Sequence, residues 1–213
     1  MIKIHRFVNN LFQVNTYILS DETGECAILD PGCYSTSERN ALTGFIRQEG
    51  LRPVVILNTH CHIDHILGNQ FVADEYGLKP RLHEKGLEFL KRLPETALGF
   101  GMEAEASPDY GEFINEGDEI KFGNSVLKVL YTPGHADGSV CFLNEGQGFV
   151  ITGDVLFNQS IGRTDLPTGD FDILQKYIRE KLYTLPDDTV VYPGHGPETT
   201  IGFEKVNNPF ISG

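Results

Sequence analysis

One short segment of this sequence holds four potential metal ligands within six residues. His60, His62, Asp64 and His65 form the pattern H-x-H-x-D-H directly after the apolar run 54–57. Imidazole and carboxylate groups are ligands of borderline to hard metal ions. Singly, each histidine could be an exposed loop residue, and Asp64 could be the N-cap of the following helix. Three of the seven histidines lie here, however, and capping explains Asp64 alone, so we predict that the segment binds metal.

Three further potential ligands also follow apolar runs. His135, Asp154 and His195 each come after a run that ends in a glycine-containing turn, and these runs are 127–131, 149–151 and 190–192. Buried strands that end in such turns place side chains at one edge of a sheet. Taken singly, the histidines could be solvated and Asp154 could be a turn former. Because the arrangement is repeated, we predict that these strand ends converge on a common site.

The rest of the pattern predicts strands and helices in both halves of the chain. Ser35 and Glu38 form a capping box for a helix that ends before Gly50 and should bury Ala41, Leu42, Phe45 and Ile46. The segment 94–115, rich in glycine and aromatic residues, is predicted to be an irregular loop or lid. The predicted strands are 2–8, 12–19, 26–29, 54–57, 79–82, 120–122, 126–131, 140–143, 149–151 and 190–192. Further helices are predicted after the histidine segment as far as Gly77, over 84–92, from Asp170, and over 199–206.

Length, charge and cysteine content limit the classes of protein. A chain of 213 residues can form one large domain. Lys and Arg number 17 against 30 Asp and Glu, and the net charge of -13 argues against nucleic acid as a partner. No segment approaches the roughly 18 apolar residues of a membrane span, and we expect no membrane partner. The four cysteines form no C-x-x-C pair and are read as reduced thiols, so we predict a cytoplasmic protein.

The ligand pattern resembles that of a known family. H-x-H-x-D-H followed by His135, Asp154 and His195, with Asp30 after an earlier strand, resembles the metallo-β-lactamase-fold hydrolase superfamily across essentially the whole chain. The resemblance implies an α/β fold, a four-layer αβ/βα sandwich with two mixed β-sheets. It also implies that residues 1–213 form a single metallo-hydrolase domain.

The resemblance further implies a site for two divalent metal ions. Zinc is the first candidate, and iron or manganese also suits a ligand set without cysteine. A hydroxide that bridges the two ions would attack the substrate, and Asp64 would orient it and receive or pass on its proton. Asp30 would orient a ligand imidazole, or would merely begin the Asp-Pro-Gly turn. One ion would take His60, His62 and His135, the other would take Asp64, His65 and His195, and Asp154 would bridge them.

Two segments resemble one branch of that superfamily. Residues 153–157 and 160–165 are similar to the short glyoxalase II-like hydrolases, also called hydroxyacylglutathione hydrolases, which implies hydrolysis of a small-molecule thioester. Full-length glyoxalase II continues into a helical region that grips glutathione, whereas 18 residues follow His195 here. We therefore expect no separate C-terminal glutathione-binding domain. Arg163 is a candidate for substrate contact, although a surface salt bridge is the commoner role of such a residue.

Two other functions remain open from the sequence. Persulfide dioxygenases share this fold and a similar Gly-Arg-Thr-Asp segment, and they use one Fe(II); that ion would be held by His60, His135 and Asp154. A non-catalytic metal-binding module is the third reading, although structural metal sites normally close their coordination with four ligands. The sequence does not indicate an oligomeric state.

Overall fold

The computed structural model describes residues 1–211, and the chain divides into two compact units. Unit 1 comprises residues 1–114 and 121–126, and unit 2 comprises residues 115–120 and 127–213. The segment 121–126 is the tip of a hairpin between β6 (Glu119–Phe122) and β7 (Ser125–Tyr131). That residues 1–213 form a single domain stays a prediction.

Unit 1 is built on a five-stranded mixed sheet in the order β1-β2-β3-β4-β5. The first three strands pair antiparallel, and β3, β4 and β5 pair parallel. β2 is buried along its whole length, and β4 is buried over its last three residues, as its apolar sequence predicts. The bounds are β1 Lys3–Asn9, β2 Val14–Ser20, β3 Glu25–Leu29, β4 Arg52–Leu57 and β5 Pro80–Arg81.

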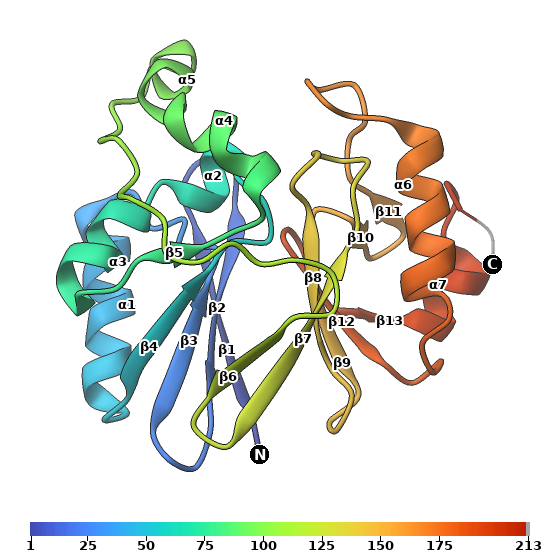
Figure 1. The fold of residues 1–213 in the computed structure, drawn as a ribbon, viewed down its shortest axis with the longest axis horizontal. Coiled ribbons are helices and arrows are strands. Elements are labelled where there is room, and N and C mark those ends of the chain that lie inside the picture. The colour runs from blue at the N-terminus through green and yellow to red at the C-terminus, as the bar shows by residue number, and fades with distance from the viewer. Residues whose placement is uncertain (212–213) are drawn as a thin grey trace. The chain divides into compact units, whose positions relative to one another are not determined.

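Helices complete unit 1 on one face and at one end of its sheet. α1 (Thr36–Gln48) and α3 (Asn69–Tyr76) cover the same face (Figure 1). Leu42 and Ile46 of α1 pack there with Val72 of α3 against Ile28 and Ile56 of the strands. A second cluster joins the shorter helices near the end of β4. These are α2 Ile63–Ile66, the 3₁₀ turn Glu84–Gly86, α4 Leu87–Lys91 and α5 Leu93–Gly99.

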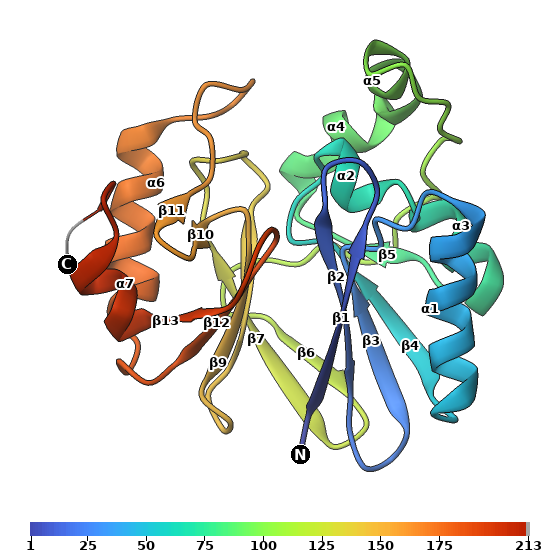
Figure 2. The ribbon, with the colours of Figure 1, turned by 180° about the vertical axis from the view of Figure 1, so that it is seen from behind.

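Unit 2 contains a six-stranded mixed sheet in the order β13-β12-β9-β8-β7-β6. β12 runs parallel to β9, and the other assigned pairs are antiparallel. α6 and α7 lie beside this sheet (Figure 2), and their apolar residues Leu174 and Ile201 share a core with Val150 and Val191 of the strands. The bounds are β8 Val140–Asn144, β9 Phe149–Gly153, β10 Leu156–Phe157, β11 Ser160–Ile161, α6 Phe171–Tyr177, a π-helical turn Ile178–Leu182, β12 Val190–Pro193, β13 Thr199–Thr200 and α7 Ile201–Asn207.

The predicted α/β class with two mixed sheets is confirmed, and the differences are local. Ala41 is exposed on α1, contrary to the prediction, because it lies on the side facing away from Leu42 and Ile46. The segment predicted to be irregular from Pro94 instead begins as α5, since proline is tolerated in the first turn of a helix. The strand predicted at 79–82 is reduced to Pro80–Arg81. Among the described residues, no helix combines the length and apolar character needed to cross a membrane.

Candidate metal centre

Four of the predicted ligands lie together in unit 1, just past the buried end of β4. His62 is the N-cap residue of α2, and Asp64 and His65 lie within that helix, so Asp64 is not its cap. His60, Asp64 and His65 are buried although they are polar or charged. Burial of such groups is costly unless they are hydrogen-bonded or coordinate a metal. The location therefore fits a site in which these side chains act together.

The ligand atoms of this group face one another in pairs. Nε2 of His60 lies 3.2 Å from Nδ1 of His62. Nε2 of His65 lies 3.5 Å from Oδ2 of Asp64. Ligand atoms of His60 and His65 are also within 4.8 Å of each other. Two pairs of donors are thus close enough for each pair to share an ion.

Asp30 connects this group to the end of β3. Its carboxylate accepts hydrogen bonds from the Thr59 backbone N–H at 2.7 Å, the Thr59 hydroxyl at 2.6 Å and Nδ1 of His65 at 2.9 Å. Because the Thr59 hydroxyl gives its proton to Asp30, it accepts from Nδ1 of His60 at 3.2 Å. Both imidazoles therefore carry the proton on Nδ1 and leave Nε2 as the ligand atom.

The other three predicted ligands lie together in unit 2. Asp154 follows β9 and His195 follows β12. Since β9 and β12 are parallel neighbours, their carboxyl ends meet at one edge of the sheet, where the Gly194 N–H donates to the Gly153 carbonyl at 2.8 Å. His135 follows β7, and the turn before it requires Gly134, which has φ 120° and would place a Cβ 2.3 Å from the backbone nitrogen of Leu174.

Asp154 lies between the two histidines of unit 2. Its Oδ2 atom is 3.6 Å from Nε2 of His135 and 3.5 Å from Nε2 of His195. Nδ1 of His135 donates to the carbonyl of Arg163 at 2.8 Å, because a carbonyl can only accept. The backbone of Arg163 thus fixes the tautomer of His135 in the way that Asp30 fixes that of His65.

The donor sets of both units fit bound metal. Two ligands of a tetrahedral ion with bonds of about 2.0–2.1 Å are about 3.3 Å apart. The facing pairs of ligand atoms, at 3.2–3.6 Å, match that spacing. Cys61, between two of the histidines, packs instead with the apolar cluster around α2, and burial raises the pKa of its thiol. Imidazole and carboxylate donors without a thiolate suit zinc, iron or manganese.

Arg163, the candidate for substrate contact, has an exposed side chain that is paired with a neighbouring carboxylate. Its exposed guanidinium donates two hydrogen bonds to Asp165, at 2.9 and 2.8 Å. These bonds hold the pKa of Asp165 down, at about 2. The side chain therefore forms a surface ion pair, and the backbone carbonyl is the part that contacts a predicted ligand.

Two contributors to the site were missed from the sequence. The Thr59 hydroxyl links His60 to Asp30 through two hydrogen bonds. Gly162 leaves room beside two ligands, because a Cβ there would lie 1.9 Å from the carbonyl oxygen of Asp154 and 3.0 Å from Cγ of His135. Thr59 directly precedes the histidine segment, so its position was a usable signal. Gly162 had none, since the contact exists only in the folded chain.

The sequence as a whole matches a known family. The profile of the metallo-beta-lactamase superfamily matches residues 9–195. The chain belongs to the metallo-beta-lactamase superfamily. Its relatives in this superfamily include the probable metallo-hydrolase YqgX of Bacillus subtilis, 39% identical over 204 residues with 94% of this chain and 93% of YqgX covered. Another is the hydroxyacylglutathione hydrolase GloC of Haemophilus influenzae, 36% identical over 203 residues with 94% of each chain covered.

Solved structures of superfamily proteins share the fold. The B3 metallo-beta-lactamase BLEG-1 gives a TM-score of 0.90 at 35% identity, with 99% of this chain and 100% of BLEG-1 covered. The structure of TTHA1623 in a di-iron-bound form gives a TM-score of 0.88 at 32% identity, with 97% of this chain and 100% of TTHA1623 covered. The structure of ETHE1 from Myxococcus xanthus gives a TM-score of 0.80 at 27% identity, with 97% of this chain and 83% of ETHE1 covered. These neighbours confirm the predicted metallo-β-lactamase fold, and the family supports a metal-dependent hydrolase.

Proposed function

We propose that this superfamily member is a di-metal hydrolase that cleaves a small-molecule thioester, such as an S-acylglutathione or a related acyl-thiol. The observation that carries the proposal is the second donor pair of unit 1. Asp64 and His65 face each other at 3.5 Å with Asp30 behind His65, in addition to the pair His60 and His62. In a site for one ion, the donor pair Asp64 and His65 would have no metal to bind. The relationship to GloC, named a hydroxyacylglutathione hydrolase, supports the thioester class.

The proposed ligand sets follow the pattern of the superfamily. His60, His62 and His135 would hold one ion, and Asp64, His65 and His195 the other. Asp154 would be shared, which agrees with the similar distances of its Oδ2 from His135 and His195. Two divalent ions, zinc first and iron or manganese as alternatives, supply a Lewis acid and bring the pKa of water to about 7.

The residues of the chain then have separate tasks. Asp30, Thr59 and the Arg163 carbonyl hold Nε2 of three imidazoles in the ligand position. The Asp64 carboxylate accepts the proton of the attacking water. A thiolate leaves without full protonation, so the chain needs no strong general acid for a thioester. Arg163 contributes its carbonyl, and its exposed guanidinium keeps three of its five N–H donors beside the two that bind Asp165.

Persulfide oxidation is the second candidate, because ETHE1 is a structural neighbour. His60, His135 and Asp154 would then hold a single Fe(II). In that case His62, Asp64, His65 and His195 would have no ligand role. Asp64 and His65 are nevertheless buried, and His65 is hydrogen-bonded to Asp30. The higher identity to GloC, 36% against 27%, also favours hydrolysis. A non-catalytic module is disfavoured by the family, because the relatives include the probable metallo-hydrolase YqgX.

The first experiment measures metal content and activity on the same preparation. We expect about two metal ions per chain and hydrolysis of S-lactoylglutathione. Asp64→Asn should lower kcat by about 100-fold or more and reduce the metal content, with the circular dichroism spectrum retained. Asp188→Asn, at an exposed aspartate, is the matched control and should leave kcat and metal content unchanged. One iron per chain, with oxygen uptake on a persulfide and no thioester hydrolysis, would replace this proposal by the dioxygenase.

A further inference from the structure

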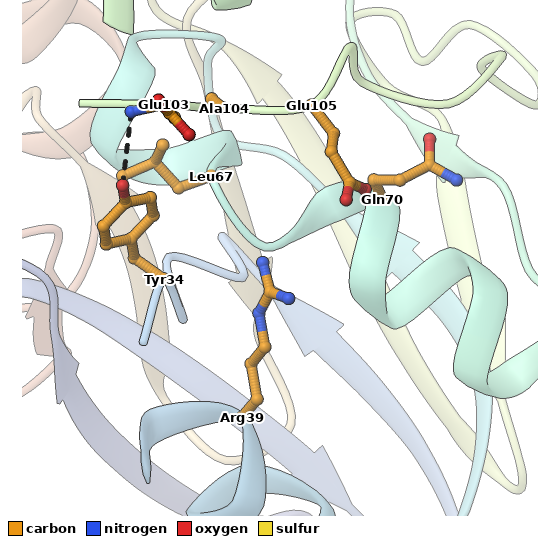
Figure 3. A pocket seen from close by; sticks show the side chains of 7 residues that line it. All are labelled: Tyr34, Arg39, Leu67, Gln70, Glu103, Ala104 and Glu105. Atoms are coloured by element: carbon orange, nitrogen blue, oxygen red, sulfur yellow. Dashed lines mark hydrogen bonds between the residues drawn. The ribbon is translucent and has the colours of Figure 1, made fainter. Parts of the chain in front are cut away.

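A cavity of about 320 Å³ lies in unit 1 and shares no residue with the metal centre. It opens between the start of α1, the junction of α2 with α3, and the segment 103–105 (Figure 3). Its volume is at the lower end of the range for small-molecule sites. The lining residues are Tyr34, Arg39, Leu67, Gln70, Glu103, Ala104 and Glu105.

Arg39 forms the base of this cavity and carries a positive charge. Figure 3 shows its side chain rising from α1 into the space between the other lining residues. The guanidinium lies over the ring of Phe71, 5.0 Å from the centroid. Its Nε is buried and has no hydrogen-bond partner among residues 1–211. In a chain of net charge -13 such a guanidinium offers a fork of donors suited to a carboxylate.

The opposite side of the cavity is acidic. Glu103 and Glu105 are exposed and come from the segment that passes over Arg39. The amide nitrogen of Gln70 donates to Asp74 at 2.9 Å, so its carbonyl oxygen remains an acceptor for a ligand. The Tyr34 hydroxyl accepts from the Glu103 backbone N–H at 3.3 Å and keeps its own proton to donate. The cavity thus has a cationic base and an anionic rim.

We propose that this cavity binds a small zwitterion of the free α-amino acid class. The carboxylate of the ligand would bind Arg39 and the Tyr34 hydroxyl, and its ammonium group would lie between Glu105 and Gln70. Leu67 and Ala104 leave an apolar wall for a short side chain. A phosphate dianion fits poorly, because both glutamates and the net charge of the protein repel it. A cation without a carboxylate leaves the charge of Arg39 uncompensated.

The test is a titration of the ¹⁵N-labelled full chain with L-alanine, L-leucine and L-glutamine, followed by NMR. At least one should shift the amide signals of Tyr34, Gln70 and Ala104 in a saturable way below about 10 mM, an affinity of a few kcal/mol. The N-acetyl derivative and the amide of that amino acid, each lacking one charge, should bind at least tenfold more weakly. Inorganic phosphate is the probe for a simple anion site.

Variants connect the binding to the two charges. Arg39→Gln and Glu105→Gln should each weaken binding at least tenfold, whereas Arg47→Gln, in the last turn of the same helix, should have no effect. Glu105→Gln lies on an exposed segment, so it gives a result even where Arg39→Gln lowers stability. No saturable shift with any amino acid, equal binding of the N-acetyl derivative, tighter binding of phosphate, or unchanged binding by Glu105→Gln overturns the proposal.

Discussion

Asp30 combines the two roles that the sequence left open. Its φ of 48° places it in the left-handed region, where the chain turns at the end of β3. A non-glycine residue pays about 1 kcal/mol or more for that conformation. The three hydrogen bonds that its carboxylate accepts from Thr59 and His65 offset this cost. The turn and the support of His65 are therefore one structural feature.

Gly162 gives a prediction for a residue that no ligand pattern contains. Gly162→Ala would place its Cβ 1.9 Å from the Asp154 carbonyl oxygen and 3.0 Å from Cγ of His135, so the Asp154 backbone must shift and the His135 ring must move slightly. We expect metal affinity to fall about 10- to 100-fold, the usual effect of disturbing the support of a ligand. The free energy of unfolding should fall by about 1–3 kcal/mol. Competition with a chromogenic chelator and urea unfolding measure the two quantities.

A second glycine supplies the control for that experiment. Gly44 lies in α1, and a Cβ added there would meet no heavy atom within 4 Å. Gly44→Ala should therefore leave metal affinity unchanged and raise the free energy of unfolding by up to about 1 kcal/mol, since alanine favours helix. Equal metal affinities for Gly162→Ala and the original chain would show that the close approach to Asp154 has no part in holding the ligands.

At the scale of elements, the start of α1 is joined to a distant turn through one carboxylate. Ser35 and Glu38 form the predicted capping box. Glu38 accepts from the backbone N–H groups of Ser35 at 2.7 Å, Tyr34 at 2.9 Å and Asn10 at 2.6 Å. Burial alone would raise the pKa of Glu38, but these hydrogen bonds outweigh it and lower the pKa. Glu38 thus takes part in the capping box and also holds Asn10 in the turn between β1 and β2.

Glu38→Gln should accordingly lower the free energy of unfolding more than loss of the Ser35 cap alone does. Glutamine keeps one acceptor oxygen for three donors, so at least one partly buried N–H loses its partner, and we expect a loss of about 1–3 kcal/mol in the free energy of unfolding. Ser35→Ala should cost about 1 kcal/mol. Glu49→Gln, at the exposed far end of α1, should cost less than about 0.5 kcal/mol. Urea unfolding at neutral pH gives all three values, and a smaller loss for Glu38→Gln than for Ser35→Ala would contradict the role given to Asn10.

Elements with strong local signals were predictable, and those fixed by partners were not. The capping residues Ser35 and Asp170 begin helices as predicted, and the long apolar runs are strands. β10, β11 and β13 have two residues each, which is too short for a periodic pattern. α5 overlaps the start of the segment 94–115, which was predicted to be irregular, and its Pro94 lies in the first turn of the helix. Residue propensity could not predict these elements. The short strands depend on pairing with other strands, and α5 depends on the position of Pro94 in the first turn of the helix.

For the whole molecule, the sequence identifies ligands but not the contacts that orient them. The seven predicted ligands follow predicted strands, which is a local property of the chain. The support of His65 by Asp30 spans 35 residues, and that of His135 by Arg163 spans 28. Nothing in a local pattern specifies such a pair. Asp30 was anticipated because of the family resemblance, whereas the carbonyl of Arg163 has no side-chain signature.

The stability of the molecule in acid should depend on another long-range contact, made by Asp21. Its carboxylate accepts from the Asn124 N–H at 2.7 Å and the Ser125 hydroxyl at 2.9 Å, more than 100 residues along the chain, and from Thr23. Burial alone would raise the pKa of Asp21, but the hydrogen bonds from Thr23, Ser125 and Asn124 together outweigh it and lower the pKa from 3.8 to about 2. The folded state therefore binds this proton less readily than the unfolded state, so the contribution is complete above about pH 4 and is lost as the pH falls towards 2.

Asp21→Asn tests this contribution at the level of the whole fold. The variant should be less stable at pH 7, by on the order of 2 kcal/mol, because asparagine keeps one acceptor where the carboxylate has two. Its disadvantage relative to the original chain should shrink between pH 4 and pH 2, since protonation removes the same charge from Asp21. Urea midpoints at pH 7, 4 and 3 measure both effects, and Asp109→Asn, on a side chain 91% exposed, is the control. A constant difference between Asp21→Asn and the original chain at all three pH values would show that the charge of the carboxylate does not stabilise its contacts with Asn124 and Ser125.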